Sequence, residues 1–168
     1  MRGLVCRPVL TCLAVMALAG AASGSRAADF VAIRLSVPVA RPADAVWSRV
    51  GGYCAIAEWL KVSCDYGSGT GEVGTVRRLR DRTVEEAMVA QTAHSYTYLQ
   101  TVGSMVPFAY HGTLAVEPAG KGASTLHYTL FYDQGAMASD TVRASEKARM
   151  TTRFQTALET MKSLAEAK

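Results

Sequence analysis

The residues best suited to acid–base chemistry in this sequence are two adjacent carboxylates, Glu85 and Glu86. They lie in a stretch with the pattern of a β-strand, so one of them faces the interior of the fold and the other faces outward. A carboxylate in an apolar pocket has a raised pKa and can act as a general acid or base. The alternative is an ion pair between the inward carboxylate and Arg77 or Arg78 from the neighbouring strand. The sequence favours the ion pair and leaves the acid–base role open.

Motifs for other kinds of catalysis or for cofactor binding are scarce. The chain contains no Gly-x-Ser-x-Gly nucleophile elbow, no His-Glu-x-x-His zinc motif and no P-loop. Its three histidines, His94, His111 and His127, are too scattered to indicate a metal site. Residues 69–74 match the glycine spacing of a dinucleotide-binding loop, but that loop needs a helix directly after it, and residues 75–79 have the pattern of a strand. We therefore predict a hairpin turn, no metal and no cofactor, and we do not favour an enzyme.

The segment that must position these side chains is the last one, Ser139–Ala167, which contains neither Pro nor Gly. Its apolar residues recur every three or four positions, which is typical of one face of an α-helix: Met150, Phe154, Leu158, Met161 and Ala165. A helix of this length measures roughly 43 Å at 1.5 Å per residue. Such a face needs a large partner surface, and the strands ahead of it provide one. The helix either packs flat on a sheet or is gripped by a curved sheet that leaves a cavity between them.

Ahead of this helix the pattern indicates a strand, two short helices and six further strands. Phe30–Val39 alternates with one apolar face, Pro42 suits the first turn of a helix, and Tyr53–Leu60 has the pattern of a second short helix. The remaining strands are separated by short turns, which suit antiparallel neighbours; we expect them at 62–66, 75–79, 83–90, 95–102, 108–117 and 124–132. A run of strands followed by a terminal helix argues for an α+β fold.

Residues 1–27 have the pattern of a secretory signal peptide. Arg2 and Arg7 precede an apolar run, and small residues lead to Ala27, after which we predict cleavage. The alternative is an uncleaved membrane anchor, for which the apolar run is short. The segment holds three of the 18 basic residues and none of the 14 acidic ones, so residues 28–168 carry a net charge of about +1. We predict a periplasmic protein with no stable membrane anchor, and no nucleic-acid partner because no face combines basic and aromatic residues.

Export would leave two cysteines, Cys54 and Cys64, in an oxidising compartment. We predict one disulfide between them, and closing so short a loop stabilises a fold by roughly 2–3 kcal/mol. The alternative is a pair of free buried thiols. A metal site is disfavoured because no further ligands lie nearby in the sequence.

Four segments, in this order and spacing, resemble those of a known superfamily. They are RPADAVW at 41–47, GYCAIAEW at 52–59 followed by Cys64, GEVGTVR at 71–77, and AHSYTY at 93–98 followed by Pro107, Tyr110 and the long helix. Together they resemble the START-like or Bet v 1-like (SRPBCC) superfamily and, within it, the polyketide cyclase/dehydrase and lipid-transport proteins. The resemblance spans Phe30 to Ala167, essentially the whole mature chain, and predicts one START-like domain at residues 28–168.

The resemblance implies a helix-grip fold. In that fold a curved antiparallel sheet of about seven strands surrounds a long C-terminal helix, with two short helices after the first strand and an apolar cavity beneath the long helix. The family's acidic position points to Glu85 as the inward carboxylate and as a catalytic candidate. Many relatives have His-Pro after the residue equivalent to Trp59, whereas this chain has Leu60-Lys61, so its cavity mouth should be more apolar there.

The resemblance implies a small hydrophobic ligand, lipid-like or polyketide-like, as the partner. The residues expected to bind it are Trp59, Arg77, Glu85, Tyr98, Tyr110, Tyr128, Phe154, Leu158 and Met161. The alternative for each is plain core packing, because a core and a cavity lining are both apolar. Three functions follow: a periplasmic carrier or sensor, which we favour; an accessory protein with a periplasmic protein partner, similar to the MxaD type of bacterial methanol oxidation; and a cyclase-like or dehydratase-like enzyme using Glu85.

Overall fold

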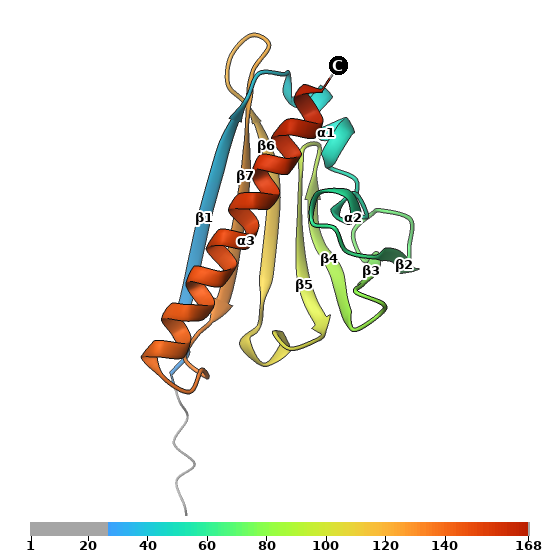
Figure 1. Ribbon diagram of the computed structural model, residues 1–168. Coiled ribbons are helices and arrows are strands. Elements are labelled where there is room, and N and C mark those ends of the chain that lie inside the picture. Colours follow the sequence, from blue (N-terminus) through green and yellow to red (C-terminus); the bar gives the residue numbers. More distant parts are fainter. Residues whose placement is uncertain (1–26, 168) are drawn as a thin grey trace, which may run out of the picture.

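The computed structural model describes residues 27–167, so the predicted signal peptide, apart from Ala27, lies outside the described residues. Its centre is one seven-stranded sheet in the order β1-β7-β6-β5-β4-β3-β2, with every neighbouring pair antiparallel. The strands are β1 (Phe30–Val39), β2 (Cys64–Ser68), β3 (Val76–Leu79), β4 (Val84–Thr92), β5 (Ser95–Val102), β6 (His111–Pro118) and β7 (Ser124–Asp133). A long helix lies diagonally across one face of this sheet (Figure 1). The predicted α+β helix-grip fold is confirmed.

The long helix, α3, runs from Asp140 to Glu166. It begins where predicted because the Ser139 hydroxyl caps it, accepting a hydrogen bond from the backbone N–H of Val142 at 3.2 Å. The predicted apolar stripe is buried against the sheet, with Ala157 added to it and Ala165 only half-buried. Within residues 27–167 no helix is long and apolar enough to cross a membrane.

Two short helices, α1 (Ala43–Val50) and α2 (Ile56–Trp59), connect β1 to β2. The helix α1 buries Ala43, Val46 and Val50, as its spacing predicts. The helix α2 is shorter than predicted, because residues 53–55 form a turn ahead of it. A disulfide joins Cys54 to Cys64, with their Cα atoms 5.6 Å apart, and so ties the start of α2 to β2. The predicted disulfide is confirmed.

The glycine-rich segment after β2 is the predicted hairpin turn, not a nucleotide loop. Gly69 has φ +73°, and a Cβ there would lie 2.3 Å from the Thr75 hydroxyl, so the turn needs glycine at this position. The expected strand at 108–117 is wrong at its start. Residues Val106–Phe108 form a 3₁₀ turn, η1, and β6 begins only at His111.

Candidate functional site

A cavity of about 260 Å³ lies between α3, α2, the strands β3–β5 and the loop that contains η1. It opens to solvent beside exposed Arg80, Ser104 and Arg149. Its lining consists of Ile56, Leu60, Leu79, Arg80, Val84, Glu86, Tyr98, Gln100, Ser104, Met105, Tyr110, Arg149, Met150, Arg153 and Phe154. Apolar side chains share this wall with charged and polar ones, and apolar surface with convergent polar groups is typical of a small-molecule site. The helix-grip alternative with a cavity is therefore the one that the structure shows.

Three buried tyrosine hydroxyls meet at one side of this cavity. The hydroxyl of Tyr98 lies 3.0 Å from that of Tyr110 and 2.9 Å from that of Tyr128. Burial raises the pKa of Tyr98 well above its usual value, and the two neighbouring hydroxyls raise it further. Burial also raises the pKa of Tyr110 and of Tyr128. All three hydroxyls therefore stay protonated at neutral pH, where they can donate hydrogen bonds but cannot act as bases.

The Tyr98 ring fits beside Tyr110 and Tyr128 because the residue opposite it on β6 is Gly112, which has no side chain. A Cβ at Gly112 would fall 2.2 Å from the Tyr98 hydroxyl oxygen and 2.3 Å from the ring carbon that carries it. The missing side chain at position 112 is therefore part of how the sequence positions the tyrosine cluster.

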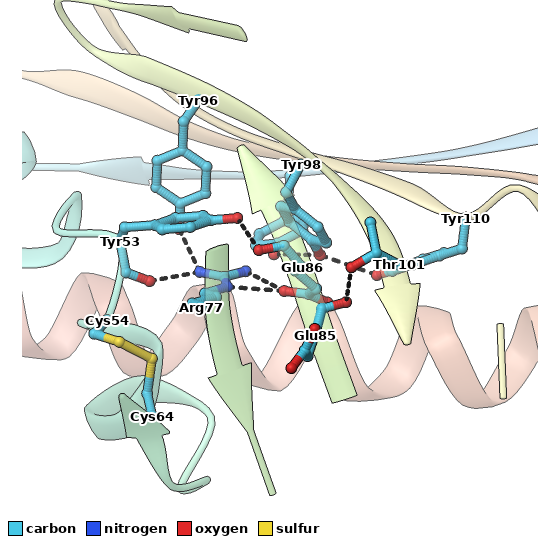
Figure 2. A network of polar contacts seen from close by, with 11 residues as sticks. Tyr53, Cys54, Cys64, Arg77, Glu85, Glu86, Tyr96, Tyr98, Thr101 and Tyr110 are labelled. Atoms are coloured by element: carbon cyan, nitrogen blue, oxygen red, sulfur yellow. Dashed lines mark hydrogen bonds and ion pairs between the residues drawn. A yellow bond between two sulfur atoms is a disulfide. The ribbon is translucent and has the colours of Figure 1, made fainter. Parts of the chain in front are cut away.

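A fully buried ion pair lies next to the cavity. The Arg77 side chain on β3 is 0% exposed and the Glu86 side chain on β4 is 7% exposed. Arg77 Nε donates a hydrogen bond to Glu86 Oε2 at 2.8 Å, and Arg77 Nη2 lies 2.6 Å from the same oxygen at an angle too poor for a second hydrogen bond. Arg77 Nη1 donates to the backbone carbonyl of Tyr53 at 2.6 Å (Figure 2). Glu86 is thus held by Arg77 where it lines the cavity.

Aromatic rings surround the buried guanidinium on its remaining sides. Its central carbon lies 4.3 Å from the centre of the Tyr53 ring, 4.7 Å from that of Tyr98 and 5.6 Å from that of Tyr96. Cations are attracted to ring faces at these distances. Burial by itself lowers the pKa of Arg77, but the charge of Glu86 and the neighbouring tyrosines together outweigh burial, and the pKa is raised. Arg77 therefore remains charged inside the fold.

The prediction that Glu85 is the inward carboxylate is wrong. Glu86 is buried and lines the cavity, whereas Glu85 is only half-buried and does not line it. The expected ion pair is present, but it joins Glu86 to Arg77 and leaves Glu85 opposite Arg78 on the other face. Figure 2 shows the Glu85 side chain directed away from Arg77. Any acid–base role in the cavity would therefore fall to Glu86.

The other predicted ligand-binding residues divide into three groups. Tyr98, Tyr110 and Phe154 line the cavity. Arg77 and Tyr128 do not line the cavity but each hydrogen-bonds to a residue that does, Arg77 to Glu86 and Tyr128 to Tyr98. The remaining three do not line it and are buried in the hydrophobic core: Trp59, Leu158 and Met161. For these three the structure shows core packing, the alternative that the sequence left open.

Several lining residues escaped the sequence analysis, above all the arginines. Arg149 and Arg153 are outside the predicted apolar stripe of α3, yet each directly precedes a stripe residue, Met150 or Phe154, and so lies at the edge of the buried face. That spacing was the available signal. Leu60 lines the cavity and gives it an apolar side chain at this position, beside the charged Arg80 and Arg153.

The three histidines make local contacts. His94 Nε2 lies 2.6 Å from Asp44 Oδ1, His111 Nδ1 lies 2.6 Å from the carbonyl of Ala109, and His127 Nε2 lies 3.5 Å from a Glu117 carboxylate oxygen. In the part of the chain that the structure describes, no three His, Cys, Asp or Glu side chains gather as a metal site would need.

Comparison with known families identifies relatives of this fold. The sequence profile described as "Polyketide cyclase / dehydrase and lipid transport" matches residues 31–166, which is nearly all of the described chain. This chain belongs to the polyketide cyclase/dehydrase and lipid-transport family. The resemblance to the START-like or Bet v 1-like superfamily is thereby confirmed. A search of curated proteins finds no match to this chain.

Solved structures share the fold of this family member at low sequence identity. The Zhui aromatase/cyclase from Streptomyces sp. R1128 has a TM-score of 0.67 at 17% identity, over 82% of this chain and 94% of that chain. Truncated norcoclaurine synthase from Thalictrum flavum has a TM-score of 0.64 at 19% identity, over 84% and 97%. A protein from Thermobifida fusca has a TM-score of 0.65 at 23% identity, over 80% and 92%. At these identities the likeness establishes the fold alone.

Proposed function

We propose that this protein is a periplasmic binding protein that holds a small hydrophobic molecule in the cavity beneath α3. The observation that carries the proposal is the cavity itself, which stays open inside a fold whose other apolar residues pack into a continuous core. Its wall offers apolar surface from Leu79, Met150 and Phe154, and the hydroxyls of Tyr98 and Tyr110 for a polar group on the ligand.

Two features support a location outside the cytoplasm. Residues 1–27 have the composition and order of a secretory signal peptide. The disulfide between Cys54 and Cys64 is compatible with an oxidising compartment, since such bonds are rare where thiols are kept reduced.

Native mass spectrometry of the protein, expressed with its own leader and purified from periplasm, tests this proposal. We expect a mass that begins after Ala27, lacks the two hydrogens lost in the disulfide, and includes a retained small apolar molecule. A full-length mass found only in the cytoplasmic or membrane fraction would contradict the location. A ligand-free protein that is isolated with a second polypeptide would favour the accessory role and contradict the carrier role.

A cavity-filling substitution tests the same proposal from the protein's side. Val84 lines the cavity from β4, and we expect Val84→Trp to fill much of the space and abolish ligand retention. Val89→Trp is the matched control, because Val89 is on the same strand but 45% exposed. Equal ligand retention by both variants would show that the ligand binds elsewhere.

One observation favours catalysis as a second candidate function. Glu86, Tyr98 and Tyr110 line the same cavity, which would give a bound substrate one carboxylate and the one hydroxyl proton that the bonds within the tyrosine cluster leave free. A cyclase-like reaction would use Glu86 as its base after the pairing with Arg77 loosens. Once a ligand is known, turnover by wild-type protein that is lost in Glu86→Gln, while ligand affinity is kept, would establish this function; absence of turnover would leave binding alone.

A further inference from the structure

Two arginines stand where the cavity meets solvent. Arg80 directly follows β3, and Arg153 lies on α3 next to Phe154. Both line the cavity, and both also line a shallow surface hollow beside it, which includes residues 60–63 and Asp81. Both arginines therefore lie where the cavity and this hollow adjoin.

These two side chains lack an acidic partner. Within residues 27–167 neither guanidinium makes a hydrogen bond or an ion pair. The other charged groups of the lining are neutralised: Glu86 by Arg77, and Arg149 by Glu146 through contacts of 2.8 and 2.5 Å. The hollow adds one cation, Lys61, and one carboxylate, Asp81, which cancel in the sum, so the mouth keeps a net charge of two positive charges.

Arg153 is also partly withdrawn from water. It is half-buried, and burial together with the charges of Arg80 and Arg149 lowers the pKa of its guanidinium. A cation in such a place is unfavourable until an anion joins it. The arrangement therefore favours a negatively charged group at this point.

The mouth is held in place by the loop opposite. The Ser63 carbonyl accepts a hydrogen bond from the backbone N–H of Arg80 at 3.3 Å, and the Ser63 hydroxyl accepts one from the N–H of Asp81 at 2.8 Å. Arg80, Asp81 and Arg82 have φ of +52°, +54° and +70°, a conformation that residues with a Cβ rarely adopt in succession. Such a backbone persists where surrounding contacts fix it, and here they fix the position from which the Arg80 side chain extends.

We propose that Arg80 and Arg153 bind the carboxylate of an amphiphilic acid whose apolar body fills the cavity. This inference rests on the proposed binding function and adds the chemical class of the ligand. A guanidinium matches a carboxylate with two parallel N–H donors. Deeper inside, the one buried guanidinium of the described chain, Arg77, is already paired with Glu86, so the free cations that can bind the acid are those at the mouth. A volume of 260 Å³ corresponds to about nine water-sized groups, so the acid is small, on the order of ten non-hydrogen atoms.

Isothermal titration of the mature protein with two matched pairs of probes tests the inference. The pairs are octanoate with 1-octanol, and 3-phenylpropionate with 3-phenyl-1-propanol; each pair shares its apolar body and differs in the charge. We expect at least one acid to bind roughly ten-fold or more tightly than its alcohol, because hydrogen bonds to charged groups are the stronger ones. Arg80→Gln and Arg153→Gln should each remove about ten-fold of the affinity for the acid and leave that for the alcohol unchanged.

Arg82→Gln is the matched control, since Arg82 lies in the same turn but lines neither the cavity nor the hollow, and it should bind the acids as wild type does. Arg153→Lys should restore part of the affinity by restoring the charge. Alcohols that bind as tightly as acids would overturn this inference and leave the proposed binding function standing. Failure of all four probes to bind, with the protein shown to be folded by circular dichroism, would overturn the binding function and this inference together.

Discussion

Replacing Glu86 with Gln would test whether charge is what holds Arg77 inside the fold. Glu86→Gln keeps the size of the side chain but leaves the Arg77 guanidinium, which is 0% exposed, without its counter-charge. Removing one partner of a buried pair costs roughly 3–5 kcal/mol. The Tyr53 carbonyl and three ring faces still contact Arg77, so we expect the lower end, about 3 kcal/mol. With a urea dependence of about 2 kcal/mol per molar, the unfolding midpoint should fall by about 1.5 M.

Urea unfolding at pH 7, followed by intrinsic fluorescence, measures this shift. Glu58→Gln is the control, because the Arg49–Glu58 pair is 42% and 43% exposed and its loss should leave the midpoint near that of wild type. The double variant Arg77→Met with Glu86→Leu removes both charges and should recover most of the lost stability. A wild-type midpoint for Glu86→Gln, or a double variant as unstable as the single one, would refute the argument.

Three further predictions concern stability. Above pH 10 the free energy of unfolding should fall steeply, because burial raises the pKa of the clustered tyrosines and the native state keeps protons that the unfolded chain releases. Unfolding measured from pH 8 to 11 checks this, and Tyr110→Phe should make the free energy of unfolding fall less steeply with pH. Cys54→Ser combined with Cys64→Ser should cost about 2–3 kcal/mol in the same urea assay, and an unchanged midpoint would show that the cross-link does not restrain the unfolded chain. Gly112→Ala should cost roughly 1–3 kcal/mol by displacing a buried ring, whereas Gly52→Ala, whose new methyl would meet only an ordinary contact at 3.7 Å, should melt like wild type.

Most of the fold could be predicted from the sequence because the spacing of the apolar residues distinguishes helices from strands. The strand Ser95–Val102 has the predicted bounds, and α3 begins after the serine expected at its start. The strand expected from Phe108 failed because Pro107 and a left-handed Ala109, φ +49°, make a turn there. An apolar residue in such a turn looks like the beginning of a strand.

The site was harder to predict, since its pattern is nearly symmetric across the sheet. Arg77 lies opposite Glu86 and Arg78 opposite Glu85, so each face carries an Arg–Glu pair and the charges alone do not show which pair is buried. Alternation gave the right period but not the right face. The sequence also did not separate residues that line the cavity from residues of the core. Both Trp59 and Phe154 are buried, and they differ only in whether space remains beside the side chain.

The order of the strands also sets a sequence of events for folding. β1 and β2 follow one another in the chain but occupy opposite edges of the sheet, and β1 pairs only with β7, so that Phe30 faces Asp133 (Figure 1). The first strand therefore has no partner until almost the whole chain has been made, and pairing between such distant segments is slow. For a protein exported as we propose, the delay would keep the chain open during its passage through the membrane. The pairing of β1 with β7 would then be a late step of folding, completed after the chain has crossed the membrane.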